Sequence, residues 1–208
     1  MITPAFSILV LGFGLGMLHA LDPDHLLTVA NLTGPRHSWQ AATSFCSHWA
    51  VGHGGALLVF GAAVLLLGSA LPLSLSHMAD HLVGLVLLLM GGFILWRLLR
   101  AQRPREPAIP AHGPPAGRGG ALAMGLLHGT AGSGPLLAIT PLPALHDPVL
   151  GMVYLGVFAC GVLTAMLGVG AVLGLGLHQL QQRAPWLITG VRAMLACGAS
   201  AVGLHLLT

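Results

Sequence analysis

The sequence predicts an all-α integral membrane protein of about six transmembrane helices, arranged as two inverted three-helix repeats. Three observations predict this class. Hydrophobic residues make up 55% of the 208 and charged residues only 6%, whereas a soluble domain carries charge on about 25% of its residues. The mean hydropathy is +0.87. Glycine, which lets membrane helices approach closely, occurs 30 times. The chain therefore lacks the polar surface needed to fold in water.

Six apolar segments are long enough to cross a bilayer core of roughly 30 Å, which takes about 20 residues. They cover Ala5–Leu32, Ser38–Ser69, Leu73–Arg100, Arg118–Ile139, Pro148–Gln181 and Pro185–Leu207. Several exceed a minimal span, so we expect tilting, breaks or protruding ends. The first segment has no cationic region before it and no small-residue cleavage pattern, so we interpret it as a retained helix rather than a signal peptide.

A hydrophilic loop divides these segments into two halves. The stretch RAQRPREPAIPAHGPPAGRGG, residues 100–120, is rich in proline and glycine, which favours a flexible loop. The predicted organisation is a first three-helix repeat over 1–100, a cytoplasmic loop over 101–117 and a second three-helix repeat over 118–208.

Arginines predict the orientation of the chain. The chain has no lysine, and in the six-helix arrangement seven of its arginines fall on one side of the membrane: Arg36, Arg97, Arg100, Arg103, Arg105, Arg118 and Arg183. The excess of positive charge marks the cytoplasmic side. We therefore expect a multi-pass protein of the cell inner (plasma) membrane with both termini outside. Arg192, within the sixth segment, is the exception.

The two halves share a short pattern. GMLHALDPDHLL, residues 16–27, aligns with GLLHGTAGSGPLL, residues 125–137, and places His19 opposite His128. The acids of the first copy are replaced in the second by Gly132, Ser133 and Gly134. With three helices per half the second copy is inverted, an arrangement that places the substrate site of many transporters at mid-membrane between the repeats.

The stretch HALDPDH holds the most unusual polar residues of the chain, His19, Asp22, Asp24 and His25. An ionised side chain at the bilayer centre costs about 2.5–3.5 kcal/mol on insertion scales. On an unbroken helix Asp24 would point away from the other three. Pro23, however, lacks an N–H and should kink or unwind the helix, which can turn Asp24 inward.

Imidazole nitrogen together with carboxylate oxygen is a ligand set suited to nickel, cobalt or zinc ions. A single membrane histidine is more often a hydrogen-bonded packing residue. Four such polar residues interrupted by a proline favour a metal site.

At this point the sequence resembles the nickel/cobalt permeases, secondary metal transporters of bacteria and some fungi. HALDPDH matches their pattern of His, four residues and Asp-His, and AVGHGGALLV is similar to their Gly-His-small-small stretch and supplies His53. LLHGTAGSGP resembles the second-half motif of shorter relatives. The resemblance implies that His19, Asp24 and His25 select the metal, supported by Asp22 and His53. Family members commonly have eight helices with the motif in the second, whereas this chain has six segments and the motif in the first.

The predicted metal set is His19, Asp22, Asp24, His25, His53 and His128. His128 either completes the site or donates a hydrogen bond to a ligand, and a purely structural role is equally compatible with its position. His48 is five residues from His53, about 140° round a helix, and is interpreted as a packing residue.

The remaining polar residues lie near the segment ends. His77, Asp80 and His81 share a helical face at the outer side, where His146, Asp147 and His205 also fall. They can collect metal before transport, or they can be solvated ends with aspartate caps, which is the interpretation we favour. His37, His112 and His178 fall on the cytoplasmic side. Cys46, Cys160 and Cys197 are isolated, which argues against a thiol–disulfide carrier and a structural zinc site.

The leading functional hypothesis is a secondary transporter of nickel and/or cobalt ions, acting in uptake, and not an enzyme. No GxxxxGK[ST] loop for ATP occurs, and no prosthetic group is expected besides the transported ion. The alternative is an intramembrane metal-dependent enzyme with the same cluster, although the chain has no HExxH. Expected partners are the metal ion and the bilayer, with no nucleic acid; glycine-rich faces of the last two segments would permit a homo-oligomer.

Overall fold

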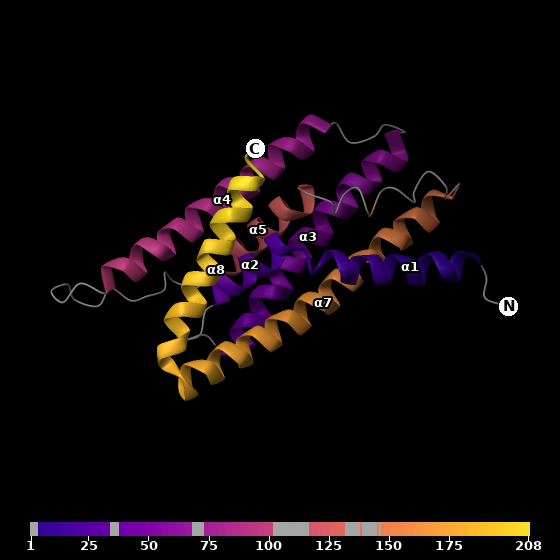
Figure 1. The fold of residues 1–208 in the computed structure, drawn as a ribbon. Coiled ribbons are helices and arrows are strands. Elements are labelled where there is room, and N and C mark those ends of the chain that lie inside the picture. The colour runs from indigo at the N-terminus through magenta and orange to yellow at the C-terminus, as the bar shows by residue number, and fades with distance from the viewer. Residues whose placement is uncertain are drawn as a thin grey trace.

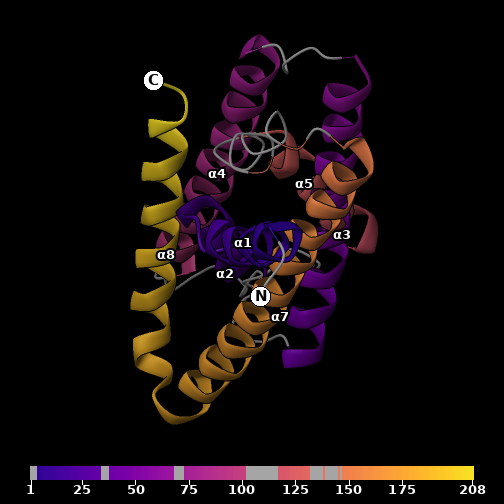
Figure 2. The same ribbon diagram turned by 90° about the vertical axis from the view of Figure 1, so that its right-hand side faces the viewer.

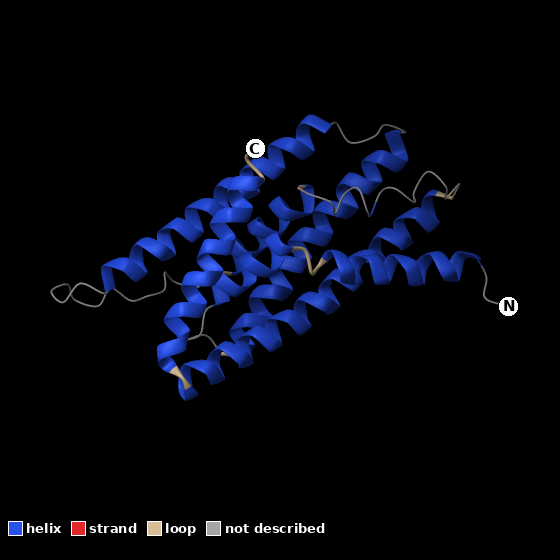
Figure 3. Cartoon of the chain, in the orientation of Figure 1, coloured by secondary structure: helices blue, strands red, loops and turns tan. Residues whose placement is uncertain are grey.

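The structure, a computed structural model, describes residues 4–33, 38–67, 73–101, 117–131, 138, 145 and 147–208. All the regular elements within these ranges are helices, as Figure 3 shows. The helices, labelled in Figure 1, are α1 (Pro4–His19), α2 (Pro23–Thr33), α3 (Trp39–Leu67), α4 (Leu73–Ala101), α5 (Arg118–Thr130), α7 (Pro148–Arg183) and α8 (Pro185–His205). The predicted all-α class is confirmed for this part of the chain.

The long helices are suited to a bilayer. Four stretches pass the length and hydropathy requirements of a membrane span, Trp39–Leu66, His77–Arg100, Pro148–Arg183 and Trp186–His205. A fifth is a broken span, Ala5–His19 with Pro23–Leu32, whose two helices are bent by 55°. Large apolar side chains such as Leu66 and Val172 are exposed on these helices, where lipid would cover them. The chain is a multi-pass membrane protein by these features.

The expected helix over Arg118–Ile139 is wrong as a single helix. The helix α5 ends at Thr130, and the next residue, Ala131, is extended with φ −106° and ψ 159°. Thirteen residues rise only about 20 Å, less than the roughly 30 Å of a bilayer core. The remaining helix bounds agree with the prediction within a few residues.

Two prolines set the start of the last two helices. Pro148 and Pro185 each occupy the first turn of their helix, where the missing N–H costs no hydrogen bond. Asp147 caps α7 by accepting a hydrogen bond from the Val149 amide over 2.9 Å, as the capping interpretation predicts. With 36 residues, α7 is about 54 Å long and must tilt or protrude from the bilayer.

The end of α4 carries side chains typical of a membrane surface. The guanidinium of Arg100 lies 4.5 Å from the centre of the Trp96 ring, and that of Arg97 lies 5.2 Å from the centre of the Phe93 ring. Tryptophan is enriched at the membrane–water boundary and arginine on its cytoplasmic side. The contacts therefore agree with a boundary near this end of α4.

The helices enclose the junction of α1 and α2. In Figure 2, α1 is seen end-on at the centre, with α8 and α4 on one side and α7 and α3 on the other. The main packed pairs are α3 with α7, α3 with α5, α4 with α8, and α1 with α7. The largest buried side chains include Trp49 of α3 and Tyr154 and Phe158 of α7, which lie in one core beside this junction.

Helices α1 and α7 cross at two glycines. A side chain added at Gly16 would meet the carbonyl oxygen of Phe158, and one added at Gly161 would meet the carbonyl oxygen of Phe13. Backbone touches backbone at this crossing, as in other membrane helix pairs with small residues at the contact.

Helices α3 and α5 cross in the same way. A side chain added at Gly125 would meet the carbonyl oxygen of Trp49, and one added at Gly52 would meet that of Leu122. Each residue of this crossing is 109 positions away in the sequence from one residue of the first crossing, as Gly125 is from Gly16. The two crossings therefore correspond residue by residue.

Residues 1–3, 34–37, 68–72, 102–116, 132–137, 139–144 and 146 lie outside the described residues. The predictions for Arg36, His37, Arg103, Arg105, His112, Gly132, Ser133, Gly134 and His146 fall there and are not tested.

Candidate metal site

The site begins at the break between α1 and α2. After His19 the backbone tightens, with amides of Leu21 and Asp22 donating to carbonyls three residues earlier, Leu18 and His19, over 3.0 Å. Pro23 then starts α2, and its missing N–H cannot continue the hydrogen bonds of α1. The kink predicted from the proline is confirmed, and it turns the carbonyl oxygen of His19 toward the ring of His25.

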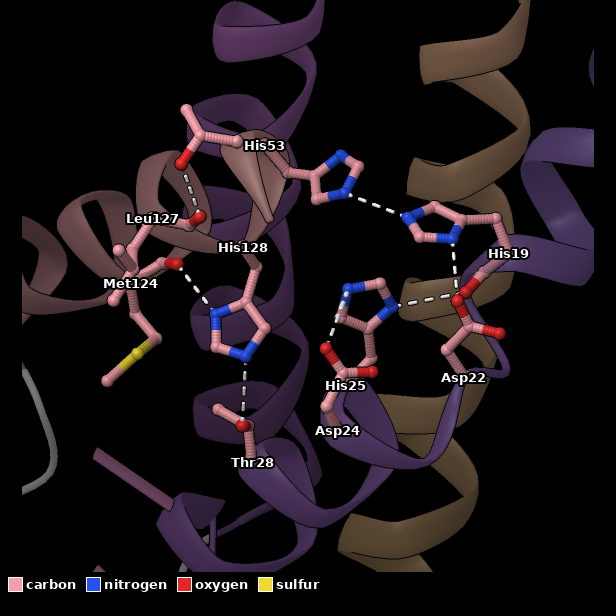
Figure 4. Close-up of polar contacts among 10 residues, drawn as sticks. His19, Asp22, Asp24, His25, Thr28, His53, Met124, Leu127 and His128 are labelled. Carbon is pink, nitrogen blue, oxygen red and sulfur yellow. Dashed lines mark hydrogen bonds and ion pairs between the residues drawn. The ribbon is translucent and has the colours of Figure 1, made fainter. Parts of the chain in front are cut away.

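Three buried histidines meet at this break. His19 ends α1, His25 lies in the first turns of α2, and His53 comes from the middle of α3; their exposed fractions are 2%, 1% and 0%. One ring nitrogen of each lies within 4.8 Å of the other two, and the Nε2 atoms of His19 and His53 are 3.1 Å apart. Figure 4 shows the three rings converging. A metal ion held by three histidines lies about 2 Å from each nitrogen. The three nitrogens would need to move closer together to hold one ion.

Hydrogen bonds orient two of these rings. His19 donates from Nδ1 to the carboxylate Oδ2 of Asp22 over 2.8 Å, and His25 donates from Nδ1 to the carbonyl oxygen of His19 over 3.1 Å. With Nδ1 protonated, Nε2 of each ring keeps its lone pair. Metal-binding histidines commonly donate their second nitrogen to a carboxylate or carbonyl in this way.

Two carboxylates lie beside the histidines. Asp24 Oδ2 is 3.8 Å from Nε2 of His25, and donor atoms of Asp22, Asp24 and His25 all lie within 4.8 Å of one another. The Asp22 side chain is 35% exposed and that of Asp24 19%, so this second group lies nearer the surface than the histidines. The break does bring Asp24 to the cluster.

His128 reaches the cluster from α5. Its Nδ1 donates to the carbonyl oxygen of Met124 over 2.9 Å, and its Nε2 lies 3.4 Å from the hydroxyl oxygen of Thr28, which can donate to it. Its ring centre is 5.4 Å from that of His25. His128 belongs to neither group of mutually close donors, so in this conformation it adjoins them and contacts Thr28.

Two aromatic residues flank the histidines. The Trp49 indole stacks on His53 with ring centres 5.0 Å apart, and Phe158 stacks on His19 at 6.0 Å. Neither Trp49 nor Phe158 belongs to the metal set predicted from the sequence. The sequence offers one signal for them, since Trp49 and Phe158 are 109 positions apart, as are His19 and His128.

Two buried polar atoms at the site lack a hydrogen-bond partner. They are the Trp49 Nε1 and the His53 Nδ1, and within the described ranges no other buried side-chain nitrogen or oxygen is in this state. Most buried polar groups in proteins are satisfied. Their concentration at one place is typical of a site that binds a ligand.

The other histidines lie apart from the cluster. His48 donates from Nδ1 to the carbonyl oxygen of Ser44 over 2.7 Å, which agrees with its interpretation as a packing residue. His77, Asp80 and His81 do not form a group of mutually close donors in the part of the chain that is described, and both of these histidines are exposed.

An apolar groove of about 660 Å³ lies outside the histidine cluster, lined by residues of α1, α2, α7 and α8 such as Leu18, Leu26, Val169 and Leu195. Its lining contains none of the candidate metal ligands. A groove of this composition in a membrane protein would take up lipid chains rather than an ion.

Comparison with known proteins finds a relative for most of the chain. No protein-family model and no solved structure matches the sequence. Among curated proteins, the urease accessory protein UreH of Bacillus sp. (strain TB-90) is 27% identical over 179 residues, which cover 81% of this chain and 77% of the relative. The chain is similar to a urease accessory protein.

Proposed function

We propose that the chain is a secondary transporter of divalent transition-metal ions, nickel and/or cobalt, acting in uptake, with its ion-binding site at the break between α1 and α2. The observation that carries the proposal is the group of three buried histidine nitrogens of His19, His25 and His53 within 4.8 Å of one another. Three imidazoles with carboxylates nearby are a ligand set for nickel, cobalt or zinc rather than for magnesium or calcium.

The charge of the site suits a divalent ion. Neutral imidazoles add no charge, and the two carboxylates of Asp22 and Asp24 would balance a doubly charged cation. Such balance matters within a membrane, where an unpaired ionised group is costly and ionisable residues usually mark a substrate path.

The register of the helix crossings supports an inverted repeat. His128 follows His19 by the same 109 positions that separate Gly125 from Gly16 and Gly161 from Gly52. In this register α1 corresponds to α5, α3 to α7 and α4 to α8. The packing of α1 on α7 then corresponds to the packing of α5 on α3, and the pairs α3–α7 and α4–α8 each join two corresponding helices. In transporters built this way, rocking of one repeat against the other exposes a central site to each side in turn.

Transport would combine binding of the ion by the histidines with movement between the two halves. An ion from outside would exchange its water for the Nε2 atoms of the histidines, and movement between the halves would open the site to the cytoplasm. The contact between His128 of the second half and Thr28 of the first lies where such movement would act. Protons compete for the same nitrogens, since ligands must be deprotonated to bind metal.

The similarity to UreH supports nickel as the cargo. The name of that relative connects it with urease, and an accessory role for urease suggests transport of nickel. A transporter that supplies nickel would serve such an enzyme, and we propose the same role for this chain, with cobalt as a second substrate because both ions accept the same donors.

The test is the content of nickel, cobalt and zinc in cells that express the wild type or His25→Ala at equal levels, measured by elemental mass spectrometry. We expect nickel or cobalt to rise only with the wild type. Equal metal content in both strains, with both proteins in the membrane, would contradict the proposal. Hydrolytic activity that depends on the intact cluster would instead favour the intramembrane enzyme.

A further inference from the structure

We infer that the metal site comprises two alternative positions that share His25: a carboxylate position formed by Asp22, Asp24 and His25, and a histidine position formed by His19, His25 and His53. The inference rests on the proposed function and adds a path to it. The ion would bind first at the carboxylate position and pass to the histidine position by exchange of ligands around His25.

The donors separate into two groups by geometry. Each set of three has donor atoms within 4.8 Å of one another, and His25 is the residue common to both. The two groups also differ in chemistry. The carboxylate position offers two oxygens and one nitrogen, which suit a hydrated ion, whereas the histidine position offers three nitrogens, which favour nickel and cobalt.

Burial gives the two positions an order. The side chains of Asp22 and Asp24 are 35% and 19% exposed, whereas His53 is fully buried. Carboxylates at a helix break within a membrane cannot face lipid without a large cost, so their exposed side must face water. An ion arriving from water therefore meets the carboxylates before the histidines.

His25 allows only one position to be filled at a time. Its Nδ1 donates to the carbonyl oxygen of His19, which leaves Nε2 as the nitrogen with a free lone pair. One lone pair binds one ion. Asp22 connects the two positions, because its Oδ2 accepts the Nδ1 proton of His19 and so holds a ligand of the histidine position.

The experiment uses Co²⁺ as the probe on the purified full-length protein in detergent. Equilibrium dialysis gives stoichiometry and affinity, and X-ray absorption counts imidazole ligands around the metal. The variants are His53→Ala, which removes only the histidine position, Asp24→Asn, which removes only the carboxylate position, and His25→Ala, which removes both. His48→Ala, five residues before His53 on the same helix and outside the cluster, is the matched control.

We expect one Co²⁺ per wild-type chain with three imidazoles. His53→Ala should still bind one Co²⁺, at least about tenfold more weakly, with a single imidazole and an oxygen-rich shell. Asp24→Asn should keep three imidazoles but load more slowly in stopped-flow mixing. His25→Ala and the double variant of His53 and Asp24 should lose binding, and His48→Ala should match the wild type.

Other results would overturn the inference. Two ions bound per wild-type chain would show that the positions are independent. Complete loss of Co²⁺ in a folded His53→Ala protein, or the same change in ligand count in His53→Ala and Asp24→Asn, would show one undivided site while leaving transport intact as a proposal. A wild-type protein that binds no Co²⁺ or Ni²⁺ would overturn the proposed function itself.

Discussion

His19 donates its Nδ1 proton to Asp22 over 2.8 Å, across the break that separates α1 from α2. The bond fixes the tautomer of His19 and directs its Nε2 at His53, 3.1 Å away. Asp22 is therefore the residue that orients a histidine of the candidate site, in addition to belonging to the neighbouring carboxylate group.

Removing this acceptor should weaken metal binding. Loss of an oriented partner of a metal-binding histidine typically costs about 10–100-fold in affinity, so we expect a loss of this size in Asp22→Ala. Asp22→Asn should lose less, because the amide oxygen can still accept the proton of His19. Nickel titration of the purified proteins measures both constants, and wild-type affinity in both variants would contradict the role of Asp22.

The glycine crossing should be sensitive to one methyl group. Gly16→Ala would place a Cβ against the carbonyl oxygen of Phe158, whereas Gly14→Ala, two residues away in α1, meets nothing within 4 Å. We expect Gly16→Ala to destabilise the protein by about 1–3 kcal/mol and to impair transport. Gly14→Ala should be neutral or slightly stabilising. Thermal unfolding in detergent compares them, and equal melting temperatures would disprove the close packing.

Trp49 should report on the ion. Its ring centre is 5.0 Å from that of His53, so nickel or cobalt bound there should quench its fluorescence. We expect saturable quenching in the wild type that is lost in Trp49→Phe. Trp186→Phe removes a tryptophan that is 76% exposed and should retain the quenching. Quenching that survives in Trp49→Phe would place the ion elsewhere.

The orientation can be tested with single cysteines in a background where Cys46, Cys160 and Cys197 are replaced by alanine. Thr208→Cys should react with a membrane-impermeant thiol reagent in intact cells, because the C-terminus is predicted outside. Ser38→Cys lies at the start of the second predicted segment, on the predicted cytoplasmic side, and should react only after permeabilisation. The reverse labelling pattern would invert the proposed orientation.

Much of the fold could be predicted from the sequence because membrane helices are specified by local hydropathy. The bounds of α3, α4, α7 and α8 agree with the apolar segments, and Pro23 marks the break. The end of α5 at Thr130 could not be predicted in the same way. Leu136, Leu137 and Ala138 keep the segment apolar past Thr130, and the prediction from hydropathy gave too little weight to the turn signal of GSGP, residues 132–135.

The candidate site could be predicted in part. Four polar residues around Pro23 indicated a site at a break in the first segment, with His19, Asp22 and His25 within one arc of an unbroken helix, and His53 followed from the resemblance to metal permeases. In the structure Asp22 accepts the hydrogen bond of His19, whereas Asp24 lies beside His25. This difference depends on the turn of backbone after His19, which the residue pattern does not specify. Trp49 and Phe158 were missed because their place beside the histidines arises from helix crossings at glycines rather than from any local motif.

Transport through the break between α1 and α2 is tested most directly by nickel flux into proteoliposomes that contain a metal-sensitive dye and the purified protein. We expect saturable nickel entry with the wild type, the same entry with His48→Ala, and none with His25→Ala, although all three proteins are folded and inserted. Nickel entry through His25→Ala at the wild-type rate would contradict the claim that the ion crosses at the break between α1 and α2.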